Sequence, residues 1–114
     1  MIPPRILKEL ATRLTEQTRS GKTTWHRASH DAQRYTAQLP GGQLVVYYSP
    51  SRGASDTIEL AVLDGSGSVI GSLVAVENEP TYDLLADLLF EVQRKNDPGG
   101  HAAVTDAILK LLNS

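Results

Sequence analysis

One stretch near the N-terminus, residues 18–31 (TRSGKTTWHRASHD), contains three patterns that resemble chemical sites: the end of a phosphate-binding loop, a pair of histidines and a contiguous Ser-His-Asp. Its letters Gly21-Lys22-Thr23 match the end of a phosphate-binding loop. Such a loop also needs a glycine five positions before Gly21, a preceding strand and a following helix, because backbone N–H groups and the helix dipole must converge on the phosphate. Glu16 stands at that position, and the helical pattern precedes the motif. The stretch therefore does not predict nucleotide binding.

The same stretch contains His26 and His30, whose spacing places two imidazoles on one face of a helix, as in helical zinc sites. A metal needs at least a third ligand, for which Asp31, Glu77 and His101 are candidates only if the fold brings them close. The tryptophan and threonines before His26 favour extended chain instead. We expect surface histidines at the end of a strand, with no metal and no cofactor.

The letters Ser29-His30-Asp31 spell a catalytic triad, but a triad requires three side chains that converge in space with the histidine in the middle. Adjacent residues of a loop point in different directions, so a polar turn is the expected structure. We predict no catalytic residue and lean against an enzyme. His26, His30 and Asp31 remain a candidate polar site.

Composition narrows the class of protein further. A chain of 114 residues with 40% hydrophobic content fits one domain, residues 1–114. The net charge of −2, with basic and acidic residues interspersed, provides no electrostatic footprint for nucleic acid. The absence of cysteine excludes disulfides and thiolate metal sites and suits a reducing compartment. The first ten residues, MIPPRILKEL, lack the apolar run of a signal peptide, so we expect a cytoplasmic protein without a membrane partner.

Hydrophobic periodicity predicts the elements that must position any site. Apolar residues recur every three or four positions from Pro3 to Gly21, which predicts a helix that glycine ends. Between 22 and 76 the period changes to two, with turns at 40–42 and 64–67, which predicts a meander of four or five antiparallel strands. Helical periodicity returns over 80–95 and over 103–112. The predicted fold is an α+β domain in which one N-terminal helix and two C-terminal helices pack on the meander.

The strands at 44–48 and 60–63 carry apolar residues on both faces. A sheet with one wet face should alternate cleanly between apolar and polar residues. Either the helices of the chain cover both faces, or one face binds a partner or a second copy. Trp25, Tyr35, Tyr47 and Tyr48 are the candidate interface residues, because tyrosine and tryptophan anchor many protein interfaces.

Asp83, Asp87 and Glu91 recur every four residues and form an acidic stripe on the predicted penultimate helix. A solvated helix face is the expected explanation, and a docking edge for a basic partner is the alternative.

Several short motifs along the chain occur in a consistent order: Gly21-Lys22-x-x-Trp25, Leu60-x-Val62-x-Asp64 and the helix start at Tyr82. In this order the chain resembles small uncharacterised bacterial domains built as helix, β-meander and helix. The resemblance implies this fold and carries no functional residue with it.

These observations lead to two hypotheses about function. The first is a non-catalytic protein-interaction or regulatory module, of the adaptor or immunity-like kind, that binds a protein partner or self-associates as a dimer through the sheet. The second is a small-molecule-binding domain or minor hydrolase with a cleft between the sheet and the C-terminal helices. An enclosed pocket with converging polar groups favours the second hypothesis, and an exposed apolar sheet face favours the first.

Overall fold

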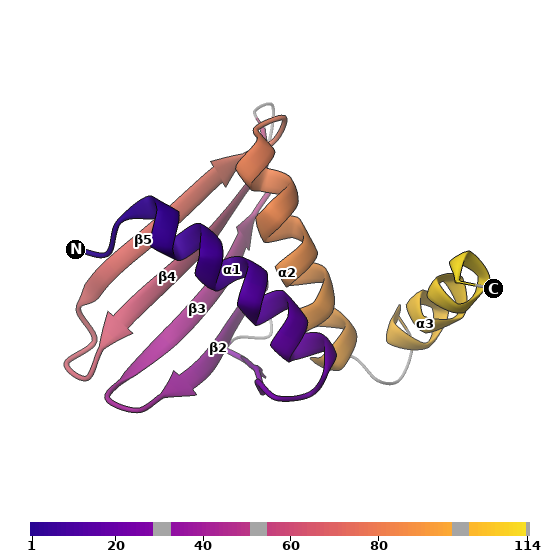
Figure 1. Cartoon of the computed structure of the whole chain (residues 1–114), viewed down its shortest axis with the longest axis horizontal. Coiled ribbons are helices and arrows are strands. Elements are labelled where there is room, and N and C mark those ends of the chain that lie inside the picture. The colour runs from indigo at the N-terminus through magenta and orange to yellow at the C-terminus, as the bar shows by residue number, and fades with distance from the viewer. Residues whose placement is uncertain (29–32, 51–54, 97–100, 114) are drawn as a thin grey trace.

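The structure is a computed structural model that describes residues 1–28, 33–50, 55–96 and 101–113. It confirms the predicted α+β arrangement of one N-terminal helix, an antiparallel sheet and two C-terminal helices (Figure 1). The elements are α1 (Pro4–Arg19), β1 (His26–Arg27), β2 (Gln33–Leu39), β3 (Gly42–Ser49), β4 (Thr57–Asp64), β5 (Val69–Val76), α2 (Pro80–Asn96) and α3 (His101–Leu112).

Helix α1 begins and ends where the local signals predict. A proline occupies its first turn, where the missing N–H would have no partner in the helix. Gly21 follows the last turn with φ of +80°, a left-handed conformation that glycine adopts at little cost. The phosphate-loop letters therefore mark the end of a helix.

The sheet has the strand order β1-β2-β3-β4-β5, and each neighbouring pair is antiparallel. Strand β3 is therefore the central strand of a simple meander. The hairpin between β4 and β5 turns at Asp64, whose carboxylate accepts the backbone N–H groups of Ser66 and Ser68 at 2.9 and 3.0 Å. Its hydrogen bond from the Ser66 hydroxyl, together with these N–H groups, lowers the pKa of Asp64.

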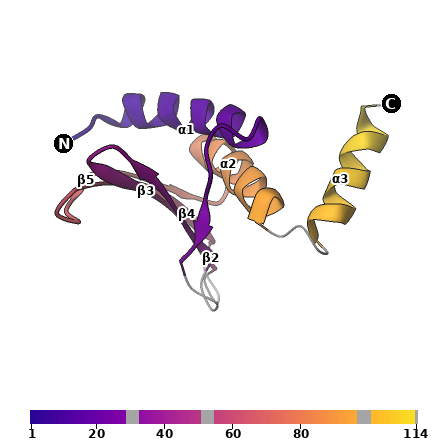
Figure 2. The same ribbon diagram turned by 90° about the horizontal axis from the view of Figure 1, so that it is seen from below.

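Both α1 and α2 lie on the same face of the sheet (Figure 2). The core fills the space between them, and its fully buried side chains come from both helices and from the central strands. The largest of these are Leu7, Leu44, Val46, Ile58, Leu60, Leu85, Leu88 and Val92. Five strands about 4.8 Å apart make a face roughly 24 Å wide, which two helices of about 10 Å diameter fill.

Helix α3 contacts α2 and stands away from the sheet in both views (Figures 1 and 2). Its apolar residues Val104, Ile108 and Leu112 are 63%, 51% and 75% exposed. The expectation that the sheet receives the apolar stripes of all three helices is therefore not met by α3. The physical reason is space, because α1 and α2 already fill the face that they share.

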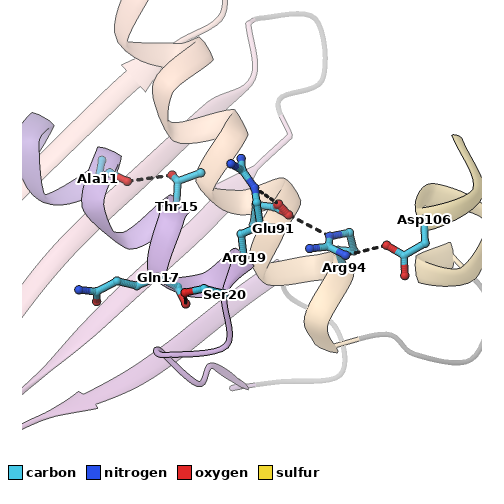
Figure 3. A network of polar contacts seen from close by, with 8 residues as sticks. All are labelled: Ala11, Thr15, Gln17, Arg19, Ser20, Glu91, Arg94 and Asp106. Atoms are coloured by element: carbon cyan, nitrogen blue, oxygen red, sulfur yellow. Dashed lines mark hydrogen bonds and ion pairs between the residues drawn. The ribbon is translucent and has the colours of Figure 1, made fainter. Parts of the chain in front are cut away.

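The prediction that the acidic stripe of α2 is a solvated helix face is wrong at one position. Asp83 and Asp87 are exposed, but Glu91 is only 3% exposed. Its carboxylate forms ion pairs with Arg19 of α1, at 3.2 Å, and with Arg94, at 2.9 Å. Arg94 also forms an ion pair with Asp106 of α3 at 2.6 Å (Figure 3). Glu91 therefore ties the ends of the two core helices together, and Arg94 extends the network to α3.

Burial disfavours the charged form of Arg94, but the hydrogen bonds to Asp106 and Glu91 and the negative charges of these carboxylates outweigh this effect and raise the pKa of its guanidinium. Among the described residues, none of the helices has both the length and the apolar content needed to cross a membrane.

Candidate functional site

The helices α1 and α2 leave one side of the sheet uncovered (Figure 2), and we call this side the open face. Successive side chains of a strand point to opposite faces, so the neighbours of the buried core residues point to this side. Cross-strand pairing arranges them in three rows from β2 to β5. The rows are Arg34, Tyr47, Glu59 and Val74; Thr36, Val45, Ala61 and Ser72; and Gln38, Gln43, Leu63 and Val69.

The middle of the open face is apolar. Val45, Ala61, Leu63 and Val69 line a shallow hollow of about 180 Å³ together with Tyr47 and with the side chains of one arginine and one glutamate. Val69 and Val74 on β5 are 51% and 55% exposed. Apolar side chains on the uncovered side of a sheet are the pattern expected of a surface that binds another protein.

Opposite charges flank this apolar middle. The guanidinium of Arg34 lies over the ring of Tyr47, with its central carbon 4.9 Å from the ring centre. On the other side of Tyr47, Glu59 accepts a hydrogen bond from the hydroxyl of Ser72. Within the described part of the chain, neither Arg34 nor Glu59 belongs to an ion pair. Arg34 and Glu59 therefore place one positive and one negative charge on the open face, on either side of Tyr47.

The four aromatic residues predicted as an interface lie in different places. Trp25 and Tyr35 are 3% and 6% exposed and belong to the core. The indole N–H of Trp25 donates to the hydroxyl of Thr18 at 2.9 Å, which fixes the end of α1 to the edge of the sheet. Tyr48 packs on the core from the helix-covered face. Tyr47 alone of the four lies on the open face.

The phenol of Tyr48 donates a hydrogen bond to the carboxylate of Asp56 at 2.6 Å. This hydrogen bond, with burial and the negative charge of Asp56, raises the pKa of Tyr48 to about 12. The residue is therefore a neutral structural group at ordinary pH.

The candidate polar site is described only in part. His26 lies exposed on the edge strand β1 and lines a hollow of about 470 Å³ beside the last turns of α1. This hollow is distinct from the one between the sheet and α2. His30 and Asp31 lie outside the described residues. In the part of the chain that the structure describes, no group of three potential metal-binding side chains converges.

A second hollow, of about 280 Å³, lies between the sheet and α2, the place predicted for a ligand-binding cleft. Tyr48, Tyr82 and Phe90 line it, together with the amides of Gln33 and Gln93, which hydrogen-bond each other. Burial raises the pKa of Tyr82. The residues that line this hollow include no carboxylate and no imidazole, so they offer hydrogen bonds and apolar contact but no group that titrates near neutral pH.

Sequence reasoning placed Val45 and Leu63 in strands that are apolar on both faces, but it did not single out Arg34 or Glu59. Their alternation with buried neighbours was the available signal, but grouping them on one surface requires the register between strands.

The comparisons with known proteins add no relative. No protein-family model, no curated protein and no solved structure matches the chain.

Proposed function

We propose that the chain is a non-catalytic protein-interaction or regulatory module, of the adaptor or immunity-like kind, that binds a protein partner or a second copy through the open face. One observation carries this proposal. Both core helices pack on one side of the sheet, and the opposite side exposes Val69, Val74 and the half-buried Val45 and Leu63. Leaving such side chains in water forgoes hydrophobic stabilisation that a partner would supply.

The composition of the open face fits the anatomy of protein interfaces. Such interfaces have an apolar centre and a polar rim, and tyrosine and arginine contribute more than their share of the binding energy. Here Tyr47 and Arg34 stack beside the apolar hollow, and glutamine, threonine and serine side chains surround it. A flat surface of this kind suits another protein better than a small molecule, which prefers an enclosed pocket.

The alternative function, ligand binding or hydrolysis in the cleft at α2, has weaker support. The groups that line that cleft are phenols, amides and apolar side chains. A hydrolase needs a nucleophile and a group that transfers protons near neutral pH. The cytoplasmic location belongs to the same proposal as the interaction module and rests on the cysteine-free composition.

The proposal is tested with three forms of the purified chain: wild type, Tyr47→Asp and Phe90→Asp. Phe90 lies on α2, away from the open face, and is 40% exposed, so its substitution is a matched control. Self-association is measured by light scattering, and partner binding by affinity capture from cell extract followed by mass spectrometry. We expect Tyr47→Asp to lose association that both other forms retain. Equal association of all three forms would overturn the proposal.

A further inference from the structure

We infer that the occupant of the open face is a second copy of this chain, packed face to face about a twofold axis that runs along β3. This inference rests on the proposed function and names its partner. It follows from the order of the strands, from the register of the charged residues and from the size of the face.

The order of the strands makes the sheet compatible with such an axis. Strand β3 is the third of five in a simple meander. A twofold axis parallel to β3, between two facing sheets, therefore places β2 of one copy over β4 of the other and β1 over β5. The strands of the two sheets then run in nearly the same direction, which is the aligned packing common in β-sandwiches. Strands β2, β3 and β4 then overlap along their length, whereas β1, with two residues, covers only part of β5.

The register makes the face complementary to itself. Arg34, Tyr47 and Glu59 are direct cross-strand neighbours, so they form one row perpendicular to β3. The twofold axis reverses this row in the second copy. Arg34 of each copy then faces Glu59 of the other, and the two Tyr47 rings meet at the axis. One dimer therefore contains two such charge pairs, as an isologous interface requires.

The next row places small and apolar groups opposite one another. Val45 meets Val45 of the second copy at the axis, and Thr36 meets Ala61. The row continues to His26 of β1, which pairs with Thr36 and comes to lie opposite Ser72 of the second copy, so each apolar side chain of this row faces a small or apolar group. The charged row therefore borders an apolar layer that both copies share.

The size of the face is close to what a specific dimer needs. Strands β2 to β5 are seven or eight residues long and β1 has two. At about 4.8 Å between strands and roughly 3.3 Å per residue, β2 to β5 cover roughly 19 by 25 Å, or about 950 Å² for two copies. A specific interface needs about 1,000 Å² in total, and the relief of the side chains adds to the projected area.

A reciprocal change of charge tests the inference. Arg34→Glu alone places two carboxylates opposite each other twice in a dimer, and Glu59→Arg alone does the same with two guanidinium groups. Because like charges that face each other oppose binding, we expect each variant to weaken the wild-type dimer at least about tenfold in light scattering. An equimolar mixture of the two variants should recover the dimer, because every facing pair then has opposite signs. The mixture also shows that both variants are folded.

Two control variants test whether the interface lies on the open face or on the helices. Asp87→Arg changes an exposed charge on α2 and should leave the dimer intact. Ile108→Glu changes the exposed apolar side of α3 and should also leave it intact. A dimer that Ile108→Glu abolishes, and that both charge reversals leave unchanged, overturns the inference in favour of α3.

The failure of this inference and the failure of the proposed function are distinguishable. A wild-type chain that remains monomeric up to millimolar concentration overturns the inference. If that monomer captures a different protein and Tyr47→Asp abolishes the capture, the proposed function stands without self-association. If neither the mass nor the capture depends on Tyr47, both fail.

Discussion

The guanidinium carbon of Arg34 lies 4.9 Å from the centre of the Tyr47 ring, on the side of the sheet that α1 and α2 do not cover. The contact restrains two long side chains before any partner arrives. Restraining side chains in advance lowers the entropy lost on binding. Tyr47 and Arg34 also line the apolar hollow, so this pair borders the apolar middle of the open face.

The two faces of β3 should respond differently to the same substitution. Val45 and Val46 are adjacent, but Val46 is fully buried in the core and Val45 is half-buried on the open face. At a protein concentration that keeps the chain monomeric, we expect Val46→Asp to lower the free energy of unfolding by more than about 3 kcal/mol, or to prevent folding, because it buries a charge. Val45→Asp should change it by less than about 1 kcal/mol. Urea denaturation followed by circular dichroism compares them, and equal losses would contradict the assigned faces.

The buried carboxylate of Glu91 should matter more than the exposed one of Asp87, one turn earlier on α2. Glu91→Gln leaves Arg94 and Arg19 without the charge that they face, and Arg94 is largely buried. Breaking a buried ion pair from one side costs about 3 kcal/mol or more. The partial exposure of Arg19 lets water compensate one of the two partners. We expect a loss of about 2 to 3 kcal/mol for Glu91→Gln and about 0.5 kcal/mol or less for Asp87→Asn in thermal unfolding. Similar melting temperatures for the two variants would rule out this role of Glu91.

The hydrogen bond from Trp25 to Thr18 should stabilise the edge of the sheet. Thr18→Val keeps the shape of the side chain but leaves the buried indole N–H without its acceptor. An unsatisfied buried donor costs about 1 to 3 kcal/mol. Thr12→Val on the exposed side of the same helix is the matched control and should cost less than about 0.5 kcal/mol. The difference should also appear as a change in tryptophan fluorescence in the Thr18 variant alone; identical spectra and stabilities would disprove the assignment.

The phenol of Tyr48 should ionise well above the ordinary pKa of a tyrosine. Its pKa is raised to about 12 by the hydrogen bond to Asp56, by burial and by the charge of Asp56, against an ordinary value of 10.0. Since the pKa in the folded chain exceeds that in the unfolded chain, this group stabilises the fold below about pH 10, and the contribution is lost as the pH rises towards 12. Absorbance at alkaline pH should show a tyrosine that ionises near pH 12, and Asp56→Asn should move its titration down towards 10. A Tyr48 that titrates near pH 10 in the wild type would refute the contact.

The local elements of this chain follow from local signals. The helices at both ends, the two hairpin turns and the antiparallel strands were predicted from the spacing of apolar residues and from Gly21, Gly41 and Asp64. Spacing and turn chemistry act between residues a few positions apart, so a single sequence contains them. The same signals also predicted an apolar surface on both sides of β3 and β4.

The tertiary structure decided which residues share a surface. The sequence predicted both Trp25 and Tyr47 as interface residues. Packing buries Trp25 against α1 and leaves Tyr47 on the open face. The helical pattern alone predicts that Glu91 is solvated. Its burial depends on the contact with Arg19, which is distant in the chain. Arg34 and Glu59 become a self-complementary pair only when the register of three strands is known. Each of these relationships depends on contacts between distant segments, whose free energies come from shared burial and pairing, and no local pattern specifies them.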